Sequence, residues 1–114
     1  MARAPVDKPP SAQAKEIEQA VNINLRQFDL TRLNSSEREN LLGLKQDLAN
    51  ARLYANSYEL SETPEEQGSN AKHSRQWLAK ANKKILKASE TNIFGPVDVA
   101  HLSAQIDQLK ADLK

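Results

Sequence analysis

Apolar side chains recur at alternating steps of three and four residues in the middle of the chain, at Leu41, Leu44, Leu48, Ala51, Ala55 and Tyr58. This spacing matches the 3.6-residue turn of an α-helix, whereas a half-buried β-strand alternates apolar and polar residues. Leu42, Leu53 and Leu60 extend the apolar stripe on one flank. We therefore expect a long amphipathic helix that packs on more than one neighbour.

Capping residues mark where this helix and the one after it begin. Ser36 and Glu39 have the S-x-x-E spacing of a capping box, in which each side chain bonds to the other residue's backbone N–H. The box predicts a helix over about 36–61. The stretch Thr63-Pro64-Glu65-Glu66 combines a threonine N-cap, a proline at the first helical position and a glutamate three residues after the cap. It predicts a helix over about 64–90.

Two shorter segments show the same period. Ser11 is a suitable N-cap for apolar residues that recur to position 28, which predicts a helix over about 11–28. After Gly95 and Pro96, Asp98 is a suitable cap for a last helix over about 98–113.

Four amphipathic helices joined by short connections favour an all-α antiparallel four-helix bundle. The chain has 114 residues, enough for one hydrophobic core, so we expect a single domain over residues 11–114. Residues 1–10 carry three prolines and no spaced apolar residues, and we predict a flexible, disordered tail there.

The composition excludes several classes of function. Without cysteine, the chain has no disulfide, no thiolate metal ligand and no cysteine nucleophile, which is compatible with the cytoplasm. A formal net charge of +1 is too small to imply a nucleic-acid partner by itself. No run of about 18 apolar residues is present, so we expect no membrane span and a cytoplasmic location.

The segment from Lys72 to Lys87 concentrates positive charge, with five lysines, one arginine and no acidic residue. On a helical wheel its lysines fall on one side, opposite an alanine-rich apolar stripe. The candidate partner-binding residues are Lys72, His73, Trp77, Lys80, Lys83, Lys84 and Lys87.

Three interpretations of this basic side remain open. It is a solvated helix face without a partner, a surface for an acidic protein, or a surface for nucleic acid on which lysines neutralise phosphates and Trp77 stacks on a base. Exposed helix faces are usually charged, which favours the first interpretation.

Catalytic, metal and cofactor sites are not indicated. With three glycines the chain has no glycine-rich phosphate loop, and no serine has a plausible base. Asp98 and His101 form one pair with metal-ligand spacing, but a di-metal bundle needs several such groups. We therefore predict no enzymatic activity, no metal and no cofactor.

The last helix has a narrow apolar seam formed by Val99, Leu102, Ile106, Leu109 and Leu113. Such a seam packs on the bundle or on the same helix of a second chain, so homodimerisation is a hypothesis. We expect a non-enzymatic adaptor, regulatory or structural protein that binds another protein through the basic face of the third helix or the seam of the fourth. The alternative is a nucleic-acid-associated accessory protein that uses the lysines of the third helix.

Overall fold

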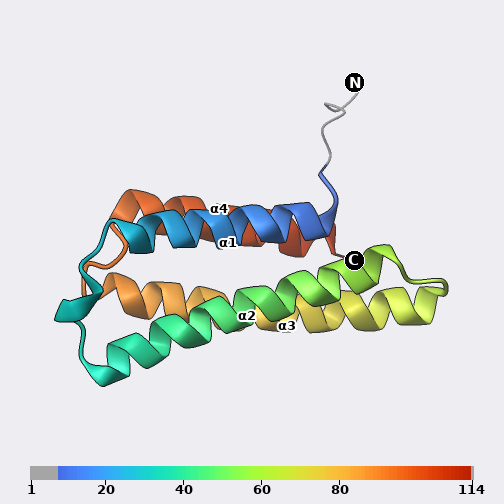
Figure 1. Cartoon of the computed structure of the whole chain (residues 1–114). Coiled ribbons are helices and arrows are strands. Elements are labelled where there is room, and N and C mark those ends of the chain that lie inside the picture. The colour runs from blue at the N-terminus through green and yellow to red at the C-terminus, as the bar shows by residue number, and fades with distance from the viewer. Residues whose placement is uncertain (1–7, 114) are drawn as a thin grey trace.

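The chain is all-α, as predicted, and the computed structural model describes residues 8–113 (Figure 1). Within that range there are four α-helices, one short 3-10 turn and no strand. The elements are α1 (Pro10–Arg26), η1 (Leu30–Arg32), α2 (Ser35–Glu59), α3 (Pro64–Ser89) and α4 (Pro96–Asp112). Of the predicted tail over residues 1–10, residues 1–7 lie outside the described residues, whereas Lys8 forms an ion pair with Glu16 and Pro10 begins α1.

The helices run alternately up and down in a four-helix bundle. Helix α1 lies beside α2 and α4, and α3 lies beside the same two helices. The most extensive interface joins α2 to α3. Small buried residues line it, including Ala51, Ala55, Ala71 and Ala81, and they allow the two backbones to approach closely. The buried Ser74 hydroxyl donates a 2.8 Å hydrogen bond across this interface to the carbonyl of Ala51.

The α2–α3 hairpin is longer than the α1–α4 pair. Helices α2 and α3 contain 25 and 26 residues, whereas α1 and α4 contain 17 each. At 1.5 Å per residue the difference is about 12 Å. The end of the hairpin therefore projects beyond the other two helices (Figure 1), and the molecule is 47 Å long with a radius of gyration of 14.8 Å.

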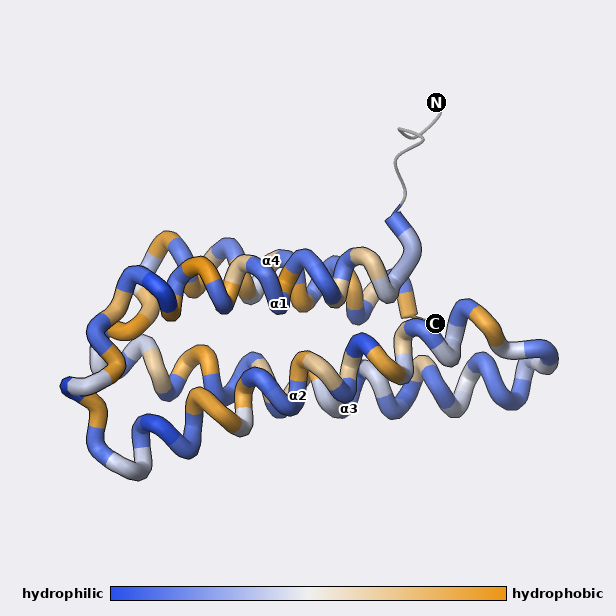
Figure 2. The backbone as a smooth tube through the Cα atoms, in the orientation of Figure 1, coloured by the Kyte–Doolittle hydropathy of each residue, from blue (hydrophilic) through white to orange (hydrophobic). Residues whose placement is uncertain are grey.

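The core runs between the four helices and is closed at one end by residues from the connections. Figure 2 shows apolar residues recurring along each helix. Leu44, Leu78 and Ile85 are completely buried. Phe94 from the α3–α4 connection and Leu33 from the α1–α2 connection are also buried, so both connections contribute to the core.

Helix α1 begins one residue earlier than predicted, and Ser11 is not its N-cap. Pro9 is the cap residue, and Pro10 occupies the first helical position, where its missing N–H is no loss. The backbone N–H and the hydroxyl of Ser11 donate instead to the carboxylate of Glu59, at 2.6 and 3.0 Å. The carboxylate of Glu59 on α2 thus accepts the hydrogen bond from the Ser11 N–H, which the side chain of an N-cap residue would otherwise accept.

Helix α2 also begins earlier than predicted. Its capping box is formed by Asn34 and Glu37, not by Ser36 and Glu39. Both pairs have the required spacing, but Leu33 is buried, and the chain enters the helix directly after it. The tertiary packing of this leucine therefore selects the earlier box.

The predicted start of α3 is confirmed, and that of α4 is not. The Thr63 hydroxyl accepts a 3.1 Å hydrogen bond from the N–H of Glu66. Helix α4 begins at Pro96 with Gly95 as its cap residue, and no side chain caps it. Asp98 lies in the first turn, where its negative charge still favours the positive end of the helix dipole.

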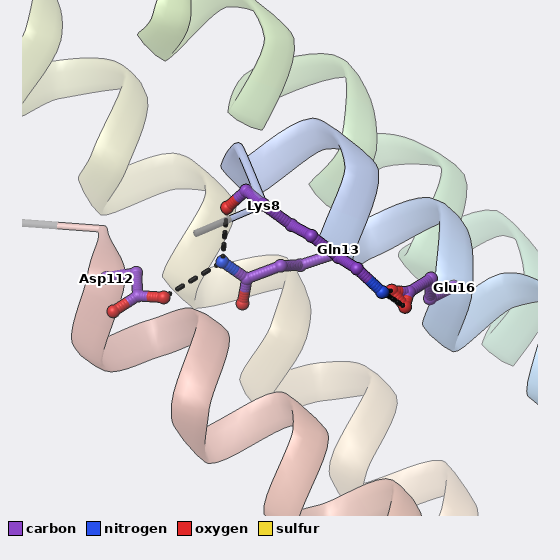
Figure 3. Close-up of polar contacts among 4 residues, drawn as sticks. All are labelled: Lys8, Gln13, Glu16 and Asp112. Atoms are coloured by element: carbon purple, nitrogen blue, oxygen red, sulfur yellow. Dashed lines mark hydrogen bonds and ion pairs between the residues drawn. The ribbon is translucent and has the colours of Figure 1, made fainter. Parts of the chain in front are cut away.

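One hydrogen bond joins the start of α1 to the end of α4, and two further polar contacts lie beside it (Figure 3). The Gln13 amide donates to the carboxylate of Asp112 at 2.9 Å and to the carbonyl of Lys8 at 2.9 Å. Lys8 in turn forms an ion pair with Glu16. The Gln13–Asp112 bond holds the first turn of α1 against α4, opposite the end that the connections close.

Candidate functional site: the basic side of helix α3

Helix α3 has an apolar side and a basic side, as predicted, but two residues of the predicted basic side, His73 and Lys84, contact α2. The side chains that face the core and are buried are Ala71, Ser74, Leu78, Ala81, Ile85 and Ala88. On the opposite side, Lys72, Lys80, Lys83 and Lys87 are exposed. Helical periodicity alone produces this division, since the lysines lie about half a turn from the buried stripe.

We call Lys72, Lys80, Lys83 and Lys87 the lysine face. At 1.5 Å per residue it extends for about 22 Å along α3. Among residues 8–113, no carboxylate lies within 4.0 Å of any of these four ammonium groups. The lysine face is therefore a row of positive charges that the described part of the chain does not neutralise.

Lys84 does not belong to this face. Its ammonium group lies 2.6 Å from the carboxylate of Asp47 on α2. The Asp47 side chain is 7% exposed and that of Lys84 is 30% exposed. Lys84 lies at the edge of the predicted basic arc, on the side where α2 packs. Its ammonium group is therefore paired across the α2–α3 interface.

His73 also turns toward α2. Its ring stacks on Tyr54 with the ring centroids 4.9 Å apart and the planes 19° from parallel. Its Nδ1 lies 2.8 Å from the carbonyl oxygen of Ser69, a distance that fits an Nδ1–H donor. The imidazole is thus held by α2 and by the preceding turn of α3, apart from the lysine face.

Trp77 lies between the two sides of α3. It is half-buried and packs against the core. The ammonium group of Lys80 lies 4.4 Å from the centroid of its ring, a cation–π contact. Lys80 therefore competes with a base for the face of the Trp77 ring that it covers.

The seam of α4 is part of the chain's own core. Leu102, Ile106, Leu109 and Leu113 are at most 1% exposed. The sequence left open whether this seam pairs within the chain or with a second chain, and the described residues bury it within the chain. Val99, the first residue of the predicted seam, is only partly buried, so the exposed apolar surface of the seam is confined to this residue.

The possible metal ligands of the described residues are scattered. Within residues 8–113, no three His, Cys, Asp or Glu side chains lie close enough to hold a metal ion. His101 and Asp98 are both exposed on α4. In the same range, no helix combines the length and the apolarity that crossing a bilayer requires.

A second exposed feature was missed by the sequence reasoning. Leu42, Leu53 and Leu60 extend the apolar stripe of α2, but they are exposed by 66%, 57% and 71%. Helix α2 packs on two neighbours through other residues. The signal in the sequence was the position of these leucines on the helical wheel, beyond the edge of the apolar seam of α2, which indicates that they stay exposed.

Comparison with known proteins adds no assignment, since no protein-family model, no curated protein and no solved structure matches the chain.

Proposed function

We propose that this protein is a non-enzymatic adaptor, regulatory or structural protein that binds an acidic protein partner through the lysine face of α3. The single observation that supports the proposal is the row of four exposed ammonium groups without a carboxylate within 4.0 Å among residues 8–113. The absence of cysteine is compatible with our proposal that the protein acts in the cytoplasm.

The lysine face opposes the stability of α3. Lys80 and Lys83 are three residues apart, and Lys83 and Lys87 are four apart, so both pairs are neighbours on the helix surface. Like-charged neighbours at these spacings destabilise a helix by about 0.2–0.5 kcal/mol per pair. A partner that supplies carboxylates would remove this repulsion, which supports binding over simple solvation.

Three observations favour a protein partner over nucleic acid. The net charge of +1 is far below that of dedicated nucleic-acid domains. The Trp77 ring is half-buried, and Lys80 lies over one of its faces, where a stacking base would have to displace it. Glu65 and Glu66 lie exposed in the first turn of α3 and would repel a phosphate backbone that continued beyond Lys72.

The test compares two variants of the full chain. One carries glutamine at all four lysines of the lysine face, and the other carries arginine at the same positions. Each is used for affinity capture from native lysate, with and without nuclease treatment. We expect a nuclease-resistant protein that the wild type and the arginine variant capture and the glutamine variant loses.

A charge-matched control removes four cations elsewhere. It carries glutamine at Lys15, Arg26, Arg32 and Lys110. This variant has the same net charge as the glutamine variant of the lysine face, so it should keep the partner if location matters. Capture that is unchanged in the glutamine variant of the lysine face would refute the proposal. A partner that disappears on nuclease treatment would assign the face to nucleic acid, as would oligonucleotide binding that weakens steeply with salt.

A further inference from the structure

A furrow runs along the interface between α1 and α2, on the side of α2 away from α3. It consists of two hollows. One, of about 220 Å³, lies where α1, η1 and the start of α2 meet, and the other, of about 240 Å³, lies between the middle parts of α1 and α2. Lys45 lines both hollows, so they are neighbours along the α1–α2 interface. We call this feature the α1–α2 furrow.

The furrow has an apolar floor and leucines at its rim. Leu25, Leu33 and Leu41 form the floor of the first hollow and are each 5% exposed. Leu30 and Leu42 line the same hollow but are exposed by 40% and 66%. Two large apolar side chains thus remain in water directly beside a hollow that is already apolar, which is a common property of interaction sites.

Two cations lie at the same rim. Arg38 and Lys45 are both exposed and line the first hollow together with Leu42. Among residues 8–113, neither has a carboxylate within 4.0 Å. The carboxylate of Glu18, which lines the second hollow, is paired with Arg52. The unneutralised charge of the furrow is therefore positive.

We propose that the α1–α2 furrow binds an acidic amphipathic helix of a partner protein. A helix that lies in a groove inserts apolar side chains spaced three, four and seven residues apart, and here they would pack between Leu30 and Leu42. Arg38 and Lys45 are seven residues apart on α2, or about 10.5 Å along its axis. Carboxylates seven residues apart on the bound helix would match both cations.

Charge disfavours a second copy of the chain as the occupant. A two-fold symmetric dimer through the furrow would bring the same patch of both chains together. Arg38 and Lys45 of one copy would then face the same two cations of the other, and like charges across an interface oppose association. The inference goes beyond the function proposed above, because the lysine face lies on a different helix.

The test uses two synthetic helical peptides as probes. Both are 18 residues long and carry leucines along one side, and they differ in having glutamates or lysines beside that side. Each is titrated into the ¹⁵N-labelled full chain. We expect the acidic peptide to shift the amide signals of Leu30, Leu42 and Lys45, and the basic peptide to bind at least tenfold more weakly.

Variants then locate the binding surface. Leu42→Glu should weaken binding of the acidic peptide at least tenfold, whereas Leu86→Glu, at an exposed leucine of α3, should leave it unchanged. If Leu42→Glu fails to fold, the double variant Arg38→Gln with Lys45→Gln replaces it. We expect this variant to bind the acidic peptide at least tenfold more weakly, and its remaining affinity should depend less on salt concentration. The glutamine variant of the lysine face should bind the peptide normally, so this inference and the proposed function can fail separately.

Three results would overturn the inference. Equal affinity for the acidic and basic peptides would show that charge does not select the partner. Unchanged affinity of the furrow variants for the acidic peptide would show that the peptide binds elsewhere. Sedimentation that shows self-association, with the same amide signals shifting on dilution, would assign the furrow to a second copy.

Discussion

Replacing Lys84 by methionine should destabilise the protein, because Lys84 is the only described residue that forms an ion pair with the buried carboxylate of Asp47. Methionine keeps most of the aliphatic length of lysine and removes the charge. The Asp47 side chain is 7% exposed, so its carboxylate would remain largely shielded from water without a partner.

The size of the effect follows from the exposure of the two partners. Removing one member of a fully buried ion pair costs about 3–5 kcal/mol, whereas an exposed pair contributes about 0–1 kcal/mol. The Lys84 side chain is 30% exposed, which places this pair between the two limits. We expect a loss of about 2–3 kcal/mol in the free energy of unfolding. For a domain of this size the melting temperature should fall by about 8–12 °C.

Urea unfolding followed by circular dichroism measures this loss. The matched control is Lys83→Met, at the neighbouring exposed lysine, which should change the free energy of unfolding by less than about 0.5 kcal/mol. The double variant Asp47→Leu with Lys84→Met replaces both charges by apolar groups and should recover to within about 1 kcal/mol of the wild type. Equal losses for Lys83→Met and Lys84→Met would refute the structural role of Lys84.

Three further predictions concern local structure. Gly68 lies inside α3 with no atom within 4 Å of an added Cβ, so Gly68→Ala should raise the free energy of unfolding by about 0.5–1 kcal/mol, measured by urea unfolding. Gly43→Ala should gain less in the same assay, because its Cβ would lie 2.8 Å from Cε of Lys84 and displace the side chain that holds Asp47; a gain equal to that at Gly68 would contradict this. The hydroxyl and N–H of Thr31 donate to Asp29 and lower the pKa of that carboxyl below its ordinary 3.8. These bonds therefore stabilise the fold fully above pH 3.8, and their contribution is lost as the pH falls through the lower folded pKa; a carboxyl NMR titration should show the midpoint rising in Thr31→Val.

The helical architecture was predictable from the spacing of apolar residues. Steps of three and four, as in Leu41, Leu44 and Leu48, can be buried together only when the chain is helical. The sharpest boundary, at Thr63 and Pro64, was also predictable, because its capping interactions are local in sequence. The basic side of α3 followed from the same periodicity, as the exposure of its four outer lysines shows.

Tertiary packing decided what a helical wheel leaves open. A wheel gives the angle of a side chain around its own helix, but not which neighbour lies at that angle. Lys84 and His73 fall within the basic arc, yet α2 occupies that side and holds both of them. Conversely, Leu42 extends the apolar stripe of α2 and remains exposed, because neither of the helices that pack on α2 covers it.

The helix starts show the same division between local and non-local causes. Thr63 caps α3 through an N–H three residues away, so its role was visible in the sequence. Ser11 has the same capping chemistry, but the carboxylate of Glu59, 48 residues away, accepts its N–H. Sequence thus determined where helices form and which sides are apolar, because those properties depend on nearby residues. Only the tertiary structure decided which charges are paired and which apolar residues stay in water, because these depend on side chains that folding brings together from distant positions.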